Sequence, residues 1–461
     1  MKFKFNDDQA FQVKFAFTDS EKEYAEFFKG EKGEILPVLC QNLILVGLGS
    51  KEDLDYLSLR LAANKLGKYI ADKDCKSITL NLKESPEIDN DECILALVEG
   101  LFLSSYNFDF YKTEKCDFNL ETVNINSNTN NLDQVEELVN VLEAQTIARD
   151  LVNKRSNDIY PESLANYTKE ELEKLGVNVK VYNKEEIEKM NLKAFMEVAK
   201  GSDKEPKFIV MEYLNGGDEK PLVLVGKGLT YDAGGYSLKP SNGMKTMNSD
   251  MGGSATVIGA MAAIAKNQVK TNVVAIVAAC ENLVSGRAYK PGDVISSLAG
   301  KTIEVDNTDA EGRLTLADAV CYGSTKYQPR LLIDLATLTG ACLVALGERF
   351  SGVITNSEES FADLQEAADK AHEKIWMLPN DDAFKELNKS KVADIKNSGG
   401  RLGGTITAGQ FVGEFVKEGT NWIHMDIAGT AYLSSSYDCF DEGATGVHVK
   451  TLYKLAKKYS K

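Results

Sequence analysis

The chain has 461 residues, of which 43% are hydrophobic and 26% are charged. These fractions lie near the averages of soluble globular proteins, which excludes a disordered, collagen-like or membrane-embedded chain. The 69 acidic residues outnumber the 53 basic ones and give a formal net charge of −16. This charge argues against nucleic acid as a partner, because a phosphate backbone would be repelled.

The first 15 residues mix charged side chains into every short apolar run. A secretory signal would instead show a continuous apolar segment and a small-residue cleavage site. No stretch of the sequence approaches the roughly 20 apolar residues that cross a bilayer. The eight cysteines are scattered without a CxxC pair, which is typical of reduced thiols. We therefore expect a cytoplasmic enzyme that does not contact a membrane.

Residues 1–130 contain apolar runs between polar stretches, and residues 105–126 alternate in the manner of strands. We expect this segment to form a smaller N-terminal α/β domain, and it offers no recognisable catalytic constellation. Apolar residues from Val135 to Leu151 then recur at roughly helical spacing. This periodicity predicts a linking helix over 131–153, followed by a catalytic domain over 154–461.

From Pro206 onward, short apolar runs end abruptly in polar or glycine-rich loops. These runs lie at 221–228, 271–280, 301–309, 330–340 and 421–429. Continuous Val, Ile and Leu runs are typical of strands that are buried on both faces and alternate with helices. We therefore predict an α/β fold whose catalytic domain has a mixed, largely parallel sheet flanked by helices. Ligands of such sheets bind beyond the carboxyl ends of the strands.

Two polar clusters follow the first of these runs. Residues 226–240 place Lys227, Asp232 and Lys239 in a loop with four glycines, which suits a charged surface loop and a ligand-binding loop equally well. Asp250 precedes a helix of small residues and could simply cap that helix. The Gly, Ser and Ala residues of this helix indicate that another segment packs very close to it.

The segment 305–320 carries the most informative cluster. Asp309, Glu311 and Arg313 are two residues apart, so an extended backbone would project all three to the same side. Carboxylates gathered at a strand end are costly unless something compensates their charge. A solvent-exposed ion cluster is the alternative, but the charges adjoin buried-strand patterns, which favours a functional site.

Together, these segments offer four oxygen ligands, which are Asp232, Asp250, Asp309 and Glu311. That number suits two divalent cations that share ligands. A nearby dication favours a neutral amine, so Lys227 or Lys239 could supply a nitrogen ligand, and a lysine left charged could stabilise an oxyanion. Arg313 could hold a small oxyanion through two parallel hydrogen bonds. The pattern predicts metal-assisted hydrolysis.

The three histidines are not predicted to be ligands, and no HExxH motif is present. His424 lies in an apolar run and is interpreted as a core or supporting residue. His372 lies in a charged helical stretch and is interpreted as a surface residue. The sequence decides little for His448.

At these positions the chain resembles the leucine (cytosol) aminopeptidases, a family of dinuclear metallopeptidases. Asn307–Leu314 reads NTDAEGRL and matches the family's signature octapeptide without a change. The segments around Lys227, Asp232, Lys239 and Asp250 match its other catalytic segments, and 334–341 and 422–429 are also similar. The resemblance covers most of 145–450, whereas the first 130 residues match only in size and position.

The resemblance implies a role for each residue of the site. Asp232 and Glu311 would bridge two metal ions. Lys227, as a neutral amine, and Asp250 would complete one metal site, and Asp309 would serve the other. Lys239 would polarise the scissile carbonyl. Arg313 would hold a bicarbonate that acts as general base toward a metal-bridging water. Three residues would line the pocket for the first side chain of the substrate, namely Met247, Thr337 and Gly340.

The implied function is that of a metal-dependent aminopeptidase that removes the N-terminal residue of short peptides, with Mn²⁺ or Zn²⁺ at its two metal sites. The family forms hexamers, so a homohexamer is expected. Ala233, Tyr236 and Asn248 depart from the usual family residues, which leaves the preferred first residue open. The alternatives are a specialised dipeptidase of the same family, acting for example on cysteinylglycine, another two-metal hydrolase such as a phosphoesterase, and a DNA-binding or scaffold role alongside catalysis.

Overall fold

The computed structural model describes residues 1–8, 10–18 and 20–460. The chain divides into two compact units, and each is described by itself. The first unit comprises Met1–Glu143 and Ser435–Asp441, and the second comprises Ala144–Ser434 and Glu442–Lys461. Helix α3 (Leu132–Asn153) contributes residues to both units.

The first unit is built on a six-stranded sheet with the order β1-β6-β5-β2-β4-β3. All of its strand pairs are parallel except β3 with β4. Helix α1 (Tyr56–Ile70) begins with a capping box of Asp55 and Ser58, and α2 (Asp91–Ser104) begins at the cap residue Asn90. The strands are β1 (Lys2–Lys4), β2 (Phe11–Ala16), β3 (Ile35–Val38), β4 (Leu43–Gly47), β5 (Ser77–Asn81) and β6 (Thr122–Asn126).

The prediction of strands throughout 105–126 is wrong for most of that segment. Only β6 forms, and residues 105–121 run as turns and irregular backbone. The ring centroids of Phe110 and Tyr111 lie 6.3 and 6.0 Å from that of Phe108, and both side chains are exposed. The alternating apolar residues therefore pack on one another at the surface instead of on a neighbouring strand.

The second unit contains an eight-stranded mixed sheet with the order β15-β14-β17-β13-β9-β10-β8-β7. Strands β17, β13, β9 and β10 are parallel to their neighbours within this group, whereas β14 pairs antiparallel with β17, and β8 pairs antiparallel with β10 and β7. The strands are β7 (Asn178–Tyr182), β8 (Lys207–Leu214), β9 (Leu222–Asp232), β10 (Asn272–Asn282), β13 (Leu331–Ala336), β14 (Ser351–Thr355), β15 (Ile375–Met377) and β17 (Trp422–Asp426).

The apolar runs of the sequence form the central strands of this sheet, with one exception. Every residue of β10, β13 and β17 is buried, as expected for strands covered on both faces. The run at 301–309 instead gives only the short strand β12 (Thr302–Glu304), which belongs to a separate three-stranded sheet with β11 (Val294–Ser296) and β16 (Ile395–Lys396). Charged residues interrupt this run, so it is half-exposed.

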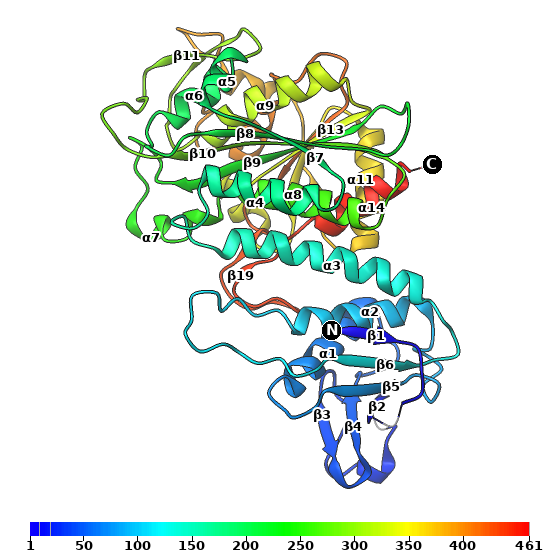
Figure 1. The fold of residues 1–461 in the computed structure, drawn as a ribbon. Coiled ribbons are helices and arrows are strands. Elements are labelled where there is room, and N and C mark those ends of the chain that lie inside the picture. Colours follow the sequence, from blue (N-terminus) through cyan, green and yellow to red (C-terminus); the bar gives the residue numbers. More distant parts are fainter. Residues whose placement is uncertain (9, 19, 461) are drawn as a thin grey trace. The chain divides into compact units, whose positions relative to one another are not determined.

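Helices cover both faces of the large sheet (Figure 1). Helices α8 (Gly252–Lys266) and α4 (Pro161–Glu173) lie on one face, and α9 (Gly312–Tyr327) and α6 (Lys193–Ala199) on the other. The remaining helices of four or more residues are α5 (Lys184–Lys189), α7 (Ser241–Met244), α10 (Gly340–Leu346), α11 (Glu358–Ala371), α12 (Asp382–Lys385), α13 (Gly404–Gly413) and α14 (Val449–Lys458). A two-stranded ribbon pairs β18 (Tyr432–Leu433) with β19 (Gly443–Ala444).

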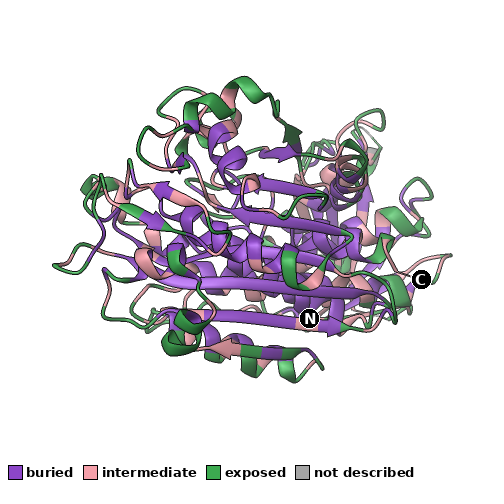
Figure 2. Ribbon diagram, turned by 90° about the horizontal axis from the view of Figure 1, so that it is seen from above, coloured by how far each residue is buried: buried purple, intermediate pink, exposed green. Residues whose placement is uncertain are grey.

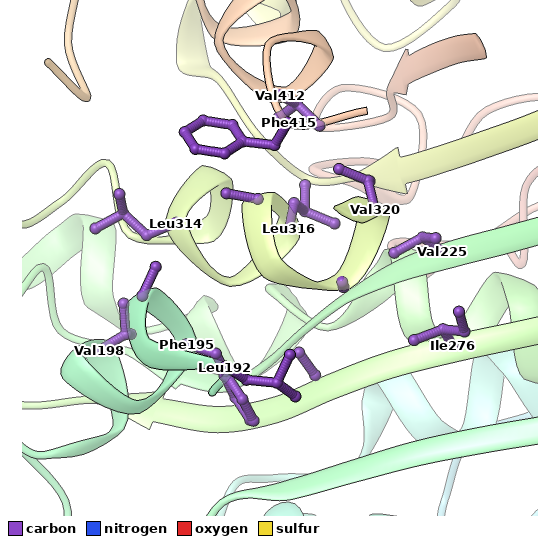
Figure 3. Close-up of a cluster of buried hydrophobic side chains, with 14 of the residues drawn as sticks. Leu192, Phe195, Val198, Val225, Ile276, Leu314, Leu316, Val320, Val412 and Phe415 are labelled. Atoms are coloured by element: carbon purple, nitrogen blue, oxygen red, sulfur yellow. The ribbon is translucent and has the colours of Figure 1, made fainter. Parts of the chain in front are cut away.

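The main apolar core lies between the sheet and α9. Leu314, Leu316 and Val320 of α9 pack among Phe195 of α6, strand residues such as Val225 and Ile276, and Phe415 (Figure 3). The central strands of the large sheet are buried, whereas the edge strands β7 and β15, the loops and the outer sides of the helices are more exposed (Figure 2). This core fixes the strand ends that carry the polar clusters.

Among the described residues, no helix has the length and apolar character to span a membrane. All eight cysteines are free thiols, and five of them are buried.

Candidate active site and metal centre

The predicted site residues begin at the carboxyl ends of the parallel strands. Strand register places Leu335 beside Gly226 and Asn282 beside Asp232, so β9 and β10 extend past the end of β13. Lys227 therefore lies at the level where β13 ends. The expectation of a loop over 226–240 is wrong at its start, because Lys227 and Asp232 belong to β9 and only Lys239 lies in the loop that follows.

Glycines allow the N-terminus of α8 to reach these strands. A Cβ on Gly226 would lie 2.6 Å from Ser254 Cα, and a Cβ on Gly253 would lie 2.0 Å from the Leu335 carbonyl oxygen. Neither position has room for a side chain. The close packing expected for this small-residue helix is confirmed, and it brings the preceding residue Asp250 against β9 and β13.

Asp250 does not cap α8. The cap position is Met251, which makes no side-chain cap hydrogen bond. Asp250 Oδ1 instead accepts hydrogen bonds from Thr337 Oγ1 and Lys227 Nζ, each at 2.8 Å, and Oδ2 has no hydrogen-bond partner in the described part of the chain. The side chain is therefore directed at Lys227 and Thr337, with one buried oxygen left for another ligand.

The prediction that an extended backbone projects Asp309, Glu311 and Arg313 to the same side is wrong, because none of the three lies in a strand. Asp309 lies in a turn, Glu311 is the residue before α9 with helical φ and ψ, and Arg313 lies in the first turn of α9. The N-terminus of α9 presses against β9, because a Cβ on Gly312 would lie 2.3 Å from Lys227 Cε. The turn and the helix start, rather than a strand, bring the two carboxylates to the site.

The acidic residues form one compact cluster bracketed by two lysines. One carboxylate oxygen from each of Asp232, Asp309 and Glu311 lies within 4.8 Å of the others. Lys227 Nζ lies 2.8 Å from Asp250 Oδ1 and 3.1 Å from Glu311 Oε1. Lys239 Nζ, on the other side, lies 2.8 Å from Asp232 Oδ2 and 2.6 Å from Asp309 Oδ1.

Burial and the negative charge of Asp232 oppose ionisation of the Asp250, Asp309 and Glu311 carboxyl groups and raise their pKa values. Burial, followed by the negative charge of Asp232, raises the pKa of Glu311 to about 8 and that of Asp309 above its ordinary value. Burial raises the pKa of Asp250 to about 6, although Lys227 opposes the shift. Burial would lower the pKa of both lysines, but the carboxylates outweigh it and raise them. Both lysines are therefore charged in the metal-free site.

The site has room and charge for cations. Lys227 and Lys239 form ion pairs with the four carboxylates, whereas the other two cations that line the cavity, Arg313 and Arg401, form no ion pair with them among the described residues. Glu311 Oε2 and Asp250 Oδ2 are buried without a hydrogen-bond partner among the described residues, and buried oxygens of this kind are normally satisfied. Hard carboxylate oxygens beside an amine fit divalent cations such as Mn²⁺ and Zn²⁺.

All predicted site residues line a single cavity of about 930 Å³. This includes Met247, Thr337 and Gly340, which were predicted to surround the first side chain of the substrate, and Arg313, which donates from Nη1 to the Asn397 carbonyl oxygen at 2.8 Å. Burial lowers the pKa of Arg313 to about 10, so it stays charged at neutral pH. Arg313 Nε has no hydrogen-bond partner among the described residues and can still donate to a ligand.

Two supporting residues were missed in the sequence. Asn282, at the end of β10, donates from Nδ2 to Asp232 Oδ1 at 2.7 Å and to the Thr308 carbonyl oxygen at 3.0 Å. The side-chain amide of Asn397 accepts from the Asp306 N–H and donates to the Asn307 carbonyl oxygen, and its backbone carbonyl oxygen accepts from Arg313. Asn282 follows the apolar run 271–280, so the strand-end signal that selected Lys227 and Asp232 could have selected it too.

None of the three histidines lines the cavity that holds the acidic cluster. His424 is fully buried on β17 and contacts Asp334 Oδ1 through Nδ1 at 2.6 Å; it does not line the cavity, as expected of a supporting core residue. His448 is also fully buried, with Nε2 2.7 Å from Ser351 Oγ. His372, expected at the surface, is half-buried at the C-terminus of α11 in the left-handed conformation.

Comparison with known proteins gives consistent likenesses over both units. Residues 146–453 match the catalytic domain of the cytosol aminopeptidase family, and residues 21–115 match the N-terminal domain of that family. A probable cytosol aminopeptidase of Treponema denticola is 47% identical over 94% of this chain and 93% of its own length. A probable cytosol aminopeptidase of Clostridium tetani is 44% identical over 100% of this chain and 99% of its own length.

Solved structures agree with this match. The bottromycin maturation enzyme BotP in complex with Mn has a TM-score of 0.89 and 29% identity, covering 98% of this chain and 99% of its own. A lysine-to-glutamate mutant of tomato leucine aminopeptidase has a TM-score of 0.88 and 28% identity, covering 99% and 96%. These likenesses do not favour the dipeptidase, DNA-binding or scaffold alternatives. With its acidic, lysine-flanked cavity at the strand ends, the chain belongs to the cytosol aminopeptidase family and is a metal-dependent aminopeptidase.

Proposed function

We propose that the enzyme holds two divalent metal ions per chain and uses them to release the N-terminal residue of short peptides. Five residues would bind the ions, with Asp232 and Glu311 shared between them, Lys227 and Asp250 on one side and Asp309 on the other. The observation that supports this proposal is the acidic cluster. One oxygen from each of three carboxylates lies within 4.8 Å of the others, and the buried oxygens Asp250 Oδ2 and Glu311 Oε2 have no hydrogen-bond partner among the described residues. Manganese or zinc would suit this donor set.

When bound, the ions would act as Lewis acids and would lower the pKa of water toward neutrality. The chain's own residues prepare the site for this chemistry. Asn282 and the Gly234 N–H donate to Asp232 Oδ1 at 2.7 and 2.8 Å, which fixes that carboxylate and leaves Oδ2 facing Lys239. Thr337 orients Asp250 in the same way. Such supporting hydrogen bonds keep ligands in one geometry.

Charged side chains would then act on the substrate. Lys239 would donate to the scissile carbonyl oxygen as negative charge develops there. Arg313 would hold a bicarbonate as general base, since it has unused donors and is charged at neutral pH. Lys227 would ligate as a neutral amine, which requires it to lose the proton that its carboxylate neighbours stabilise without metal. Met247, Thr337 and Gly340 would contact the first side chain.

The ion count tests this proposal directly. We expect two ions per chain by plasma mass spectrometry after loading with Mn²⁺ or Zn²⁺, loss of leucinamide hydrolysis after chelation, and recovery when either ion is restored. Glu311→Gln should lower the ion content, whereas Asp306→Asn should not, because Asp306 is exposed and does not line the cavity. One ion per chain, or full activity in ion-free enzyme, would contradict the two-ion proposal.

We further propose that the enzyme works in the cytoplasm and assembles as a homohexamer. The names of the relatives, which are cytosol aminopeptidases, support the first statement. The second rests on the hexamer that the resemblance to this family implies. Light scattering on the purified enzyme would give a mass near six times 50.6 kDa if the assembly is correct. A monomer at micromolar concentration would contradict it.

A further inference from the structure

One cation of the cavity has no role in the site described so far. Four cationic side chains line the cavity, namely Lys227, Lys239, Arg313 and Arg401. The two lysines are paired with carboxylates, and Arg313 is buried and donates to Asn397. Arg401 is exposed and has no hydrogen bond or ion pair with any residue that the structure describes. Among the described residues that line the cavity, it is therefore a cation whose charge is not used by the site described above.

The backbone presents Arg401 at the cavity from a glycine-rich loop. Gly400 and Gly403 flank it with φ of +87° and +62°, values that side-chain-bearing residues rarely adopt. A Cβ on Gly400 would meet nothing within 4 Å, whereas one on Gly403 would meet the Phe384 ring at 2.8 Å. The loop is thus packed on one side and open on the other. It follows directly on Asn397, which is tied to the segment of the catalytic carboxylates.

Exposed apolar side chains line the same cavity as Arg401. Leu402, Val344 and Leu343 line the cavity and are 80%, 88% and 42% exposed. A cavity that offers exposed apolar side chains together with an unpaired cation fits a ligand that has an anionic group attached to an apolar one. The last residue of a peptide, with its free carboxylate, has this chemistry.

The charges of the cavity would also orient such a peptide. The acidic cluster repels a carboxylate, and Arg401 attracts it, so the two ends of a short peptide experience opposite fields within one cavity. An extended dipeptide or tripeptide spans only about 7–10 Å, a length that a cavity of about 930 Å³ can hold, so its carboxylate would remain within the field of Arg401. A long peptide would carry its carboxylate out into solvent, where the attraction is screened.

We propose that Arg401 binds the free C-terminal carboxylate of dipeptide and tripeptide substrates, which makes short peptides with an apolar last residue the favoured substrate class. This inference rests on the proposed aminopeptidase site and adds a second anchoring point to it. Binding of the carboxylate would lower KM more than it raises kcat, because the contact is remote from the scissile bond and is made before the transition state.

A matched pair of substrates tests the contact. Leu-Leu and Leu-Leu-amide share the scissile bond and side chains and differ only in the charge at the C-terminus. We expect Arg401→Ala to lower the ratio of kcat/KM for the acid over the amide by about tenfold, as for a partly exposed charge-assisted contact. Arg401→Lys should restore part of the ratio. Arg287→Ala is the control, since Arg287 pairs with Asp203 at the surface outside the cavity, and it should leave the ratio unchanged.

The outcomes separate this inference from the proposed function. An equal loss of kcat/KM on the acid and on the amide in Arg401→Ala would show that Arg401 only maintains the structure of the site. A ratio of kcat/KM that does not change, with no loss on either substrate, would show that Arg401 does not contact the carboxylate. Either result overturns the inference while hydrolysis of the amide by the unsubstituted enzyme still supports the aminopeptidase site. Failure of the unsubstituted, metal-loaded enzyme on both substrates would overturn the two together.

Discussion

Replacement of Lys239 by methionine tests the proposed chemistry most directly. Its ammonium lies 2.8 Å from Asp232 and 2.6 Å from Asp309, and these carboxylates keep its pKa raised, so it is charged throughout the neutral range. Methionine preserves much of the length and removes the charge. Loss of one preorganised donor to a developing oxyanion costs about 10²–10³ in kcat, or about 3–4 kcal/mol. We expect that loss for Lys239→Met with leucinamide, with a much smaller change in KM.

Ion content separates this role from a role in assembling the site. Lys239 neutralises part of the acidic cluster, so its removal leaves more negative charge and should not weaken the binding of dications. Lys245→Met is the matched control, because Lys245 is exposed and does not line the cavity. The assay is kcat and KM at saturating Mn²⁺, with ions counted in the same samples. A kcat within threefold of the unsubstituted enzyme at full occupancy, or a kcat that falls only in proportion to the ions, would refute the reasoning.

Two further substitutions probe the support of the site and the core behind it. Asn282→Ala removes the amide that holds Asp232, and we expect about 10–100-fold weaker Mn²⁺ binding by calorimetry; an unchanged dissociation constant would mean that the Gly234 N–H alone is sufficient. Asp318 of α9 is buried, and burial raises its pKa to about 7 despite hydrogen bonds from the Leu298 and Phe195 N–H groups. The folded state therefore binds this proton more tightly than the unfolded chain, so the free energy of unfolding should fall by up to about 4 kcal/mol as pH rises from about 4 to about 7. Asp318→Asn should make the thermal midpoint depend less on pH across that range. A variant whose midpoint keeps the pH dependence of the unsubstituted enzyme would contradict the raised pKa of Asp318.

The sequence predicted the positions of the site better than its local conformation. Apolar runs ending in polar residues identified β9, β10, β13 and β17, because strands buried on both faces need uninterrupted apolar side chains. The polar residue that follows such a run must lie at the sheet edge. That reasoning placed Asp232 at the carboxyl end of the sheet, although Asp232 is the last residue of β9 and does not lie in the loop that was expected. Applied to β10, it would also have selected Asn282.

The errors came from residues whose conformation depends on distant packing. Gly226 and Gly228 suggested a loop, but Gly226 lies within β9 because the backbone of α8 approaches it. A spacing of two at Asp309 and Glu311 is compatible with a strand or with a turn entering a helix, and only the contact of Gly312 with Lys227 decides between them. The residues on either side of Gly226 or Gly312 do not reveal which distant segment packs against that glycine, namely Ser254 in the first case and Lys227 in the second.

The same dependence explains why the acidic cluster can exist at all. Carboxylates brought together in the interior oppose folding, as the raised pKa values of Glu311 and Asp250 indicate. Each is held by an element that is already fixed by the apolar core, since Asp232 ends a buried strand, Asp250 precedes a buried helix and Glu311 begins another. The core therefore supplies the free energy that holds these charges in place before any cation arrives. A site prepared in this way binds cations without first having to fold around them. The buried carboxylate oxygens of Asp250 and Glu311 that have no hydrogen-bond partner among the described residues show that the site is already arranged for cations.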